Sequence, residues 1–463
     1  MAVCLGGAFI TMLDVSIVNV AMPSMQQGLH AGSAQVQLIV AGYALAMALL
    51  VVPAGRIGDA RGRRMMFMLG VAGFGVMSLL AGLAQTDTYL AVIRLLQGAF
   101  AGIINPQTSG LIQQMFQGKE RGKAFGMMGA TIGVATALGP VVGGAIVTLV
   151  GSQNGWRWVF FINVPIVLVV VPLAKRLLPS PVAKDAPPRL DIPGVALIGL
   201  ASAVGMVPFI GTAEAGQASL GPWRWWMIGV AILILGVFLL WERRYQAKFG
   251  AAVLDPSLIS NVGYRFGVMI GMAYFAGFNS IFLIVTMVLQ RGLNYPALLA
   301  GLIGAPFAVG SGLAAPMAGR MVGRFGRAWQ IGGLVLMLAG LGTMDMVLRW
   351  TPPHDLGWAL AVAGFFTGLG SGSVISPNQT LTLAAVPPRI GGVAGGVMQV
   401  GQRIGSAVGM SIVLSGFFAN YAALGAQGAA AKTLIASMAM IGVALLIAIL
   451  DWFRRRDHAD VLA

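Results

Sequence analysis

The chain has 463 residues, of which 57% are hydrophobic and 9% are charged. Soluble globular proteins carry about 25% charged residues, so this composition excludes a soluble enzyme and a disordered chain. The apolar runs are continuous over about twenty residues, which predicts membrane-crossing helices rather than the alternating strands of a barrel. We therefore expect an all-α polytopic membrane protein surrounded by a lipid bilayer.

The net charge of the chain is +15. A basic balance is typical of nucleic-acid-binding domains, but Lys and Arg also gather in the cytoplasmic loops of membrane proteins, which explains the charge here. The single cysteine, Cys4, and the three histidines have no spacing typical of metal ligands. The sequence thus predicts no nucleic-acid partner, no metal and no cofactor.

Fourteen apolar segments are each long enough to cross about 30 Å of hydrocarbon as a helix. In chain order they run over 3–24, 35–55, 66–86, 89–112, 124–150, 156–178, 191–213, 222–241, 263–289, 297–318, 328–349, 356–381, 391–418 and 430–452. The two segments between 191 and 241 are also compatible with one re-entrant hairpin, although each of them is long enough to cross.

The distribution of basic residues predicts the orientation of these spans. Most of the 29 Lys and Arg residues fall in loops on one side of the predicted membrane. The loops of the other side hold Arg157, Arg224, Arg291, Arg349 and Lys432. Because basic loops stay in the cytoplasm, we expect a multi-pass protein of the cell (cytoplasmic) membrane with both termini in the cytoplasm.

Two loops on the same side have similar sequences and follow equivalent spans. At a common offset they match Gly55 with Gly319, Arg56 with Arg320, Gly62 with Gly326, and Arg63 with Arg327. This pattern favours two parallel six-helix halves over two unrelated basic turns. The predicted units are an N-terminal six-helix bundle (1–178), a cytoplasmic linker (179–190), two inserted transmembrane helices (191–241), a cytoplasmic connection (242–262), a C-terminal six-helix bundle (263–452) and a cytoplasmic tail (453–463).

The first of these loops has the composition of a conformational latch. Its glycines permit a tight turn, and its arginines cannot enter hydrocarbon and therefore hold two helix ends at the inner membrane surface. Asp59 can pair with a neighbouring arginine or lie at a helix N-terminus, and Gly323 replaces it in the second copy. The predicted latch comprises Gly55, Asp59, Arg61, Gly62, Arg63 and Arg64.

Two ionisable residues within the early spans are candidates for chemistry. Asp14 lies in the middle of the first span, and Arg94 lies in the fourth. Removal from water favours the protonated form of a carboxyl group and a nearby cation favours the charged form, so a paired carboxylate can bind and release protons. We expect the two residues to lie close enough to couple; for each, a purely structural contact between helices is the alternative.

The fifth span contains a cluster of small residues around a proline, formed by Gly139, Pro140, Gly143 and Gly144. Proline removes one backbone hydrogen bond and bends a helix, and glycines allow close approach to a neighbouring helix. We expect a bend that shapes the helix sealing a central cavity, with helix packing alone as the alternative.

Five segments together carry a resemblance to a known family. They are LDVSIVNVAMP at 13–23, GRIGDARGRR at 55–64, RLLQG at 94–98, GPVVGG at 139–144 and GWRWVFFINVP at 155–165. In this order they resemble the major facilitator superfamily and, within it, the fourteen-helix drug:proton antiporters of the QacA/EmrB type. Beyond residue 165 the resemblance depends on the topology and the degenerate repeat.

The resemblance implies a major facilitator fold of two six-helix bundles with two extra transmembrane helices between them. It implies a proton-coupled antiporter that exports amphipathic small molecules by alternating access, with Asp14 as the main protonation site and 139–144 as the antiporter motif. The sequence has no nucleotide-binding loop, catalytic motif or channel filter, so we expect a monomeric transporter and not an enzyme. Export of a specific endogenous lipid, peptide or metabolite is the alternative.

By the same resemblance, the first, second, fourth, fifth, ninth, tenth and thirteenth spans line the substrate cavity. Aromatic, methionine and amide side chains adapt to several amphipathic shapes. The scarcity of membrane acids other than Asp14 argues against strongly cationic substrates, and Arg403 either faces the cavity or ties helices together. The candidate lining residues are Asn19, Tyr43, Asn105, Gln107, Phe275, Phe278, Asn279, Phe282, Phe307, Asn378, Gln399 and Arg403.

Overall fold

The computed structural model of the protein describes residues 1–31, 33–151, 153–179, 191–206, 208, 225–249, 258, 260–387 and 390–460. The elements of this part of the chain are helical, which confirms the expected all-α architecture. They are α1 (Ala2–Leu29), α2 (Ser33–Arg61), α3 (Arg63–Gly82), α4 (Asp87–Met115), α5 (Gly118–Val150), α6 (Gly155–Phe161), α7 (Asn163–Leu177), α8 (Ile192–Met206), α9 (Trp226–Phe249), α11 (Val262–Thr286), the π-helical turn η3 (Met287–Gly292), α12 (Ala297–Phe325), α13 (Arg327–Trp350), α14 (Leu356–Ala384) and α15 (Gly391–Asp460).

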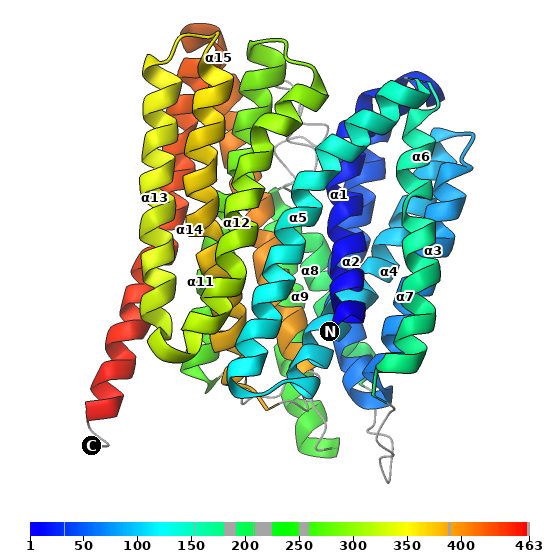
Figure 1. The fold of residues 1–463 in the computed structure, drawn as a ribbon. Coiled ribbons are helices and arrows are strands. Elements are labelled where there is room, and N and C mark those ends of the chain that lie inside the picture. The colour runs from blue at the N-terminus through cyan, green and yellow to red at the C-terminus, as the bar shows by residue number, and fades with distance from the viewer. Residues whose placement is uncertain are drawn as a thin grey trace.

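The helices stand side by side in two groups. Helices α1 to α4, α6 and α7 form one group, and α11 and α13 to α15 form the other, while α5 and α12 pack along each other between the two (Figure 1). Buried aromatic side chains such as Phe67 and Phe74 fill the first group, and Tyr274 and Phe417 fill the second. Because lipid tails are as apolar as these side chains, van der Waals packing holds each group together, and the buried cluster of the first group extends to Tyr264 of α11 and Met398 of α15.

The prediction of fourteen spans is not confirmed. Among the described residues, eleven helices are long and apolar enough to cross a membrane, or twelve if the bent helix α1 counts as one span. Helix α8 has only 15 residues, and residues 209–224, which belong to the predicted seventh and eighth spans, lie outside the described part of the chain.

Helix α15 contains two of the predicted spans. It is interrupted by one non-helical residue, Gly425, whose φ of 66° lies in the left-handed region that glycine tolerates without strain. Figure 1 shows the chain reversing direction at the top of α15 and returning to the C-terminus at the bottom. The 391–418 and 430–452 segments are therefore antiparallel neighbours.

Helix α1 bends by 47° between its two parts, Ala2–Val18 and Val20–Leu29. The sequence places a proline at position 23, which has no backbone N–H to donate to the carbonyl group of residue 19. A lost bond of this kind is an established cause of kinks in helices. The bend lies just over one turn after Asp14. It therefore sets the angle between the part of α1 that carries Asp14 and the part that follows.

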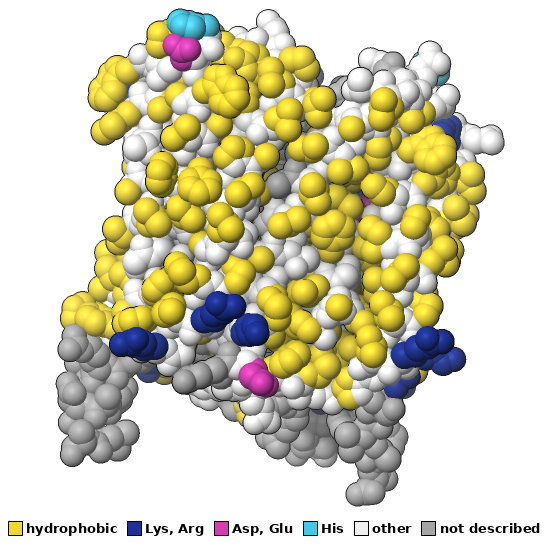
Figure 2. All heavy atoms as spheres, in the orientation of Figure 1, with side chains coloured by type: hydrophobic (Ala, Val, Ile, Leu, Met, Phe, Trp, Pro, Cys, Tyr) yellow, Lys and Arg dark blue, Asp and Glu magenta, His cyan; other side chains and the backbone are white. Residues whose placement is uncertain are grey.

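Basic residues gather at one end of the molecule. In Figure 2, hydrophobic side chains cover most of the visible face, and Lys and Arg lie mainly along its lower edge. The α2–α3 turn at 61–64 and the α12–α13 turn at 324–327 belong to this end, which we call the basic end. A protein that spans a bilayer has an apolar surface in the hydrocarbon layer and charged residues at its borders, which is the distribution seen here.

The inserted helices lie beside α2. A Cβ atom at Gly199 of α8 would stand 2.5 Å from the carbonyl oxygen of Leu49, so the two helices approach closely. Helix α9 packs on α8, and it leaves large side chains such as Ile232 and Leu233 exposed. Exposed apolar side chains on a membrane helix face lipid, so this pair lies at the periphery of the bundle.

Candidate functional site

A buried ion pair joins α1 to α4. The Arg94 Nη1 group donates to the Asp14 Oδ2 atom at 2.6 Å, and the two residues are 1% and 0% exposed. The structure thus brings together the two membrane charges that the sequence singles out. Removing a charge from water is costly unless it is paired and hydrogen-bonded, so each residue depends on the other.

Amide side chains complete the surroundings of the Asp14 carboxylate. Its Oδ1 atom accepts hydrogen bonds from the amide nitrogens of Gln97 at 3.0 Å and Asn163 at 3.1 Å. Gln97 also donates to Ser78 at 2.8 Å and accepts from Arg94 at 2.7 Å. The carboxylate is therefore held by residues from two other helices, α4 and α7, and through Ser78 the network also reaches α3, so a change in its charge affects the packing of these helices.

The sequence predicts no contact of Gln97, Ser78 or Asn163 with Asp14. Gln97 and Asn163 lie in the segments 94–98 and 155–165 that carry the family resemblance, and Gln97 follows Arg94 by three residues, a spacing that puts both on one helix face. Ser78 carries no signal of its own, since neutral polar residues are common in membrane helices.

Two aromatic rings pack against the Arg94 guanidinium group. Its Cζ atom lies 4.2 Å from the ring centre of Tyr43 and 5.6 Å from that of Phe160. Within the described chain, the Tyr43 hydroxyl and the Arg94 Nε have no hydrogen-bond partner. Tyr43, a predicted cavity residue, thus lies beside the predicted proton site.

The predicted antiporter motif packs on α1 next to Asp14. A Cβ atom at Gly139 would stand 2.3 Å from the Ser16 hydroxyl, and one at Gly143 would stand 2.8 Å from the Ile17 side chain. Ser16 also donates to the carbonyl oxygen of Thr136 at 2.7 Å. Gly144 instead faces Leu298 of α12. The glycines therefore allow α5 to touch both the helix of the membrane acid and the opposite half, and α5 continues as one helix through Pro140.

The predicted latch joins the two halves at the basic end. Arg63 pairs with Asp59 at 2.7 Å and donates to the carbonyl oxygen of Gly110. Asp59 also accepts from the backbone N–H groups of Gly392 at 3.2 Å and Val393 at 3.0 Å. These are the first N–H groups of α15, which an acidic side chain satisfies well.

The other latch residues surround this contact. Gly62 starts α3 with a φ of 114°, which few other residues adopt. A Cβ atom at Gly55 would stand 2.6 Å from the carbonyl oxygen of Gly392. Arg64 donates to the carbonyl oxygen of Lys175 on α7, while Arg61 is exposed in the last turn of α2.

The matching position in the second half has a different acid. Arg327 starts α13 as Arg63 starts α3, but its carboxylate partner is Asp451 of α15, at 2.8 Å. Arg327 also donates to Gln330 at 2.6 Å and to Asn378 at 3.1 Å. Gly323 stands where the first half has Asp59, and the carboxylate that pairs with the arginine comes instead from Asp451, a distant part of the chain.

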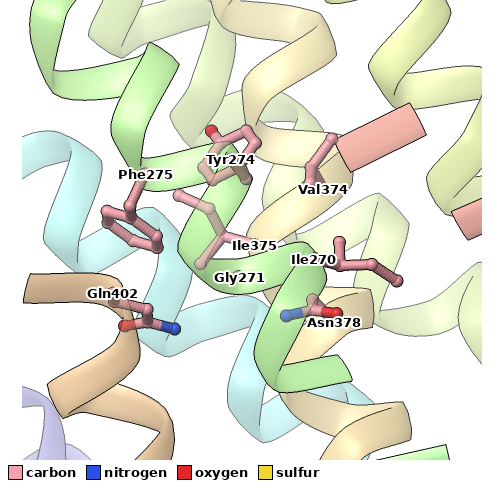
Figure 3. A pocket seen from close by; sticks show the side chains of 8 residues that line it. All are labelled: Ile270, Gly271, Tyr274, Phe275, Val374, Ile375, Asn378 and Gln402. Atoms are coloured by element: carbon pink, nitrogen blue, oxygen red, sulfur yellow. The ribbon is translucent and has the colours of Figure 1, made fainter. Parts of the chain in front are cut away.

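Aromatic side chains of the C-terminal half line two small cavities. One is lined by Phe278, Phe282 and Phe307 together with Gly133 and Thr136 of α5, so it lies between the halves. Rings of Phe282 and Phe307 lie 4.8 Å apart, edge to face. The second cavity lies in the C-terminal half, and its lining residues are Ile270, Gly271, Tyr274, Phe275, Val374, Ile375, Asn378 and Gln402 (Figure 3).

The remaining predicted cavity residues are spread more widely. Asn279 donates to Ser406 at 2.6 Å, so it ties α11 to α15. Asn105 and Gln107 donate to the carbonyl oxygens of Ala101 and Ala54, and Gln107 lies at an α2–α4 contact away from both cavities. Gln399 and Arg403 are half-buried on α15. The side chain of Asn19 lies outside the described residues.

The fold and these contacts define a class of protein. One helical half contains a buried ion pair, a small cavity lies between the halves and another within the C-terminal half, and a polar contact joins the halves at one end. Such an arrangement is compatible with a membrane transporter. The chain belongs to the Major Facilitator Superfamily, whose model matches residues 4–194, 193–410 and 266–462, and it is therefore a transporter and not an enzyme.

Individual relatives agree with this assignment. The "Probable actinorhodin transporter" of Streptomyces coelicolor is 33% identical over 419 residues, which cover 90% of this chain and 72% of that protein. The puromycin resistance protein of Streptomyces alboniger is 33% identical over 481 residues, which cover 99% of this chain and 92% of that protein. A solved proton:xylose symporter has a TM-score of 0.68 at 15% identity, covering 97% of this chain and 94% of that chain, and this likeness shows the fold alone.

Proposed function

We propose that the protein is a proton-coupled antiporter that exports amphipathic small molecules by alternating access. The proposal includes the fourteen-helix QacA/EmrB type, with the 191–241 segment inserted between two six-helix halves. It also includes a monomer in the cell membrane with both termini in the cytoplasm, where the basic end would be retained.

The buried Asp14–Arg94 pair is the observation that carries the proposal. Protonation of Asp14 would remove the negative charge that compensates Arg94 at 2.6 Å and would disturb the hydrogen bonds from Gln97 and Asn163. An arginine left unpaired in a buried site is strongly unfavourable, so the protonated protein gains by repacking α1 against α4. Proton binding would therefore bias the conformation of the N-terminal half.

The latch is the element on which this bias would act. The closed basic end depends on Asp59 and the first N–H groups of α15, and α5 packs both on α1 and on α12. A shift of α1 is thus transmitted to the interface between the halves. Alternating access requires two packings of that interface that differ by a few kcal/mol.

A pH gradient provides the test. We expect proteoliposomes of the purified protein to move amphipathic compounds such as puromycin faster when a pH gradient is imposed, and nigericin to abolish the effect. Because coupling is reciprocal, a gradient of the compound should also drive protons the opposite way, measured with trapped pyranine. If the compound moves only down its own gradient, at a rate that does not depend on the pH gradient, proton coupling is refuted and the protein is a facilitator.

Export of one endogenous product is the second candidate. It is favoured by relatives with single-compound names, the actinorhodin transporter and the tetracenomycin C resistance and export protein of Streptomyces glaucescens, which is 30% identical over 409 residues. Deletion of the gene distinguishes the two. Loss of one secreted molecule without drug sensitivity favours the specific exporter, and broad sensitivity favours the multidrug exporter.

A further inference from the structure

Arg403 is a membrane-depth cation without an acidic partner. It lies near the middle of the 391–418 segment, and the described part of the chain offers it neither an ion pair nor a hydrogen bond. The fully buried arginines that the structure describes, Arg63, Arg94 and Arg327, each have a carboxylate oxygen within 2.6–2.8 Å. A charge kept at this depth without a partner marks a functional position.

The helical period places Arg403 on the face of α15 that meets the opposite half. Gly392 and Gly396 of α15 pack closely on Gly55 and Val51 of α2. Arg403 follows these glycines by eleven and seven residues, which are three and two helical turns, so it shares their face. Its guanidinium group is therefore directed at α2.

Tyr43 of α2 is the neighbour it meets. Gly392 lies against Gly55 and Gly396 lies against Val51, so the antiparallel register of α15 and α2 places Arg403 opposite residues 43–44. Tyr43 is 2% exposed, and its hydroxyl has no hydrogen-bond partner in the described residues. A buried hydroxyl without a partner is unfavourable, so an acceptor from outside the chain would satisfy the Tyr43 hydroxyl and Arg403 together.

An apolar surface lies on the neighbouring face of α15. Gln402, which precedes Arg403 in the sequence, lines the cavity whose walls also include Phe275 and Tyr274 of α11 (Figure 3). The ring centre of Phe278 lies 5.6 Å from that of Phe275 and 5.9 Å from that of Phe307. Phe278 and Phe307 line the cavity between the halves, so a row of rings connects the two cavities. A flat aromatic body would pack on these rings.

We infer that Arg403 and the Tyr43 hydroxyl bind an acidic group of the exported molecule, whose aromatic body lies on the Phe275–Phe307 rings. The inference rests on the proposed export function and names its substrate class as anionic aromatic compounds. The Asp14–Arg94 pair is neutral as a unit, so Arg403 sets the sign of the charge that the site attracts. One donor comes from each half, so binding of the acid would also connect the halves.

Fluorescein and rhodamine 123 test the charge preference, because they share a xanthene ring and differ in the sign of their charge. We expect the purified full-length protein to bind fluorescein at least about tenfold more tightly by fluorescence anisotropy, a difference one charge contact readily supplies. Arg403→Gln should remove this preference and Arg403→Lys should retain part of it. Lys432→Gln, which removes an exposed charge, is the matched control.

Several outcomes overturn the inference. The first is that the wild-type protein binds the two dyes equally well, or does not bind fluorescein at all. The second is that Lys432→Gln loses as much of the preference for fluorescein as Arg403→Gln does. If Arg403→Gln does not fold, Tyr43→Phe should still weaken fluorescein more than rhodamine 123, and an equal effect on both dyes also refutes the site. Transport in proteoliposomes is measured separately: Arg403-dependent binding without transport driven by a pH gradient supports the anion site and refutes the proposed antiport.

Discussion

The Asp59 carboxylate accepts a hydrogen bond from the backbone N–H of Val393 at 3.0 Å, and this bond connects the two halves of the transporter. The same carboxylate pairs with Arg63 at 2.7 Å. Gln113 of α4 adds a parallel contact by donating to the carbonyl oxygen of Leu383 at 2.6 Å. Polar bonds thus join the two halves at the basic end, and the proposed alternating access requires that they break.

Asp59→Asn should weaken the closed state. Hydrogen bonds to charged groups contribute about 1.5–3 kcal/mol, and the neutral amide loses both the pairing with Arg63 and part of the attraction to the start of α15. We expect spin labels on the two halves at the basic end to move apart and turnover to fall. Asp355→Asn makes the same change where the side chain is 62% exposed, and it should alter neither. Unchanged distances and turnover would mean that the turn is only an anchor.

Asp14→Asn should abolish export driven by a pH gradient, while downhill exchange of substrate persists. The variant leaves Arg94 without a carboxylate, so we also expect its thermal stability to fall. The double variant Asp14→Asn/Arg94→Gln removes both charges and should regain stability without regaining proton coupling. Proteoliposome transport and thermal unfolding of the same preparations separate the two effects. A single variant that still couples would exclude Asp14 as the proton carrier.

The Asp14–Arg94 pair could be predicted because the first four spans contain few charges. A buried arginine needs an acceptor, and Asp14 is the membrane acid within reach of the same half. The partner of Arg327 could not be found this way. Asp451 follows Arg327 by 124 residues and lies at the end of the last predicted span. From the sequence, an acid at that place is expected to face water. Local sequence does not specify such a pairing; it depends on how α15 packs on α13.

Helix lengths were also only partly predictable. Apolarity predicts 35–55 for the second span, but α2 extends over Ser33–Arg61. Hydrophobic residues mark the hydrocarbon layer, whereas a helix continues until its backbone is capped or turned, here by Gly62 with its φ of 114°. The sequence does not predict the break between α6 and α7, because 155–177 is one continuous apolar segment. The two helices together form one candidate membrane span.

Gly139→Ala should destabilise the contact between α1 and α5. The new methyl group would lie 2.3 Å from the Ser16 hydroxyl and 2.9 Å from the backbone nitrogen of Ile17, so backbone must shift. Overpacking of this kind costs about 1–3 kcal/mol. Gly442→Ala is the matched control, because nothing lies within 4 Å of the added methyl group. Thermal unfolding should show a lower midpoint only for the first variant; equal midpoints would mean that α1 and α5 adjust freely.

Arg327→Gln should be the most damaging of the charge removals in the C-terminal half. It removes the partner at 2.8 Å from Asp451, which is 0% exposed and retains Arg454 at 3.2 Å, and breaking a buried pair costs about 3–5 kcal/mol. Arg349→Gln breaks an ion pair of the same length, but the arginine is 43% exposed, so the expected cost is about 0–1 kcal/mol. Thermal unfolding of the purified variants compares the two directly. Arg327→Gln/Asp451→Asn should recover much of the loss, because no buried carboxylate remains and Arg454, whose side chain is 31% exposed, can be hydrated. A double variant as unstable as Arg327→Gln would mean that the bonds of Arg327 to Gln330 and Asn378, rather than its charge, hold this end of the half together.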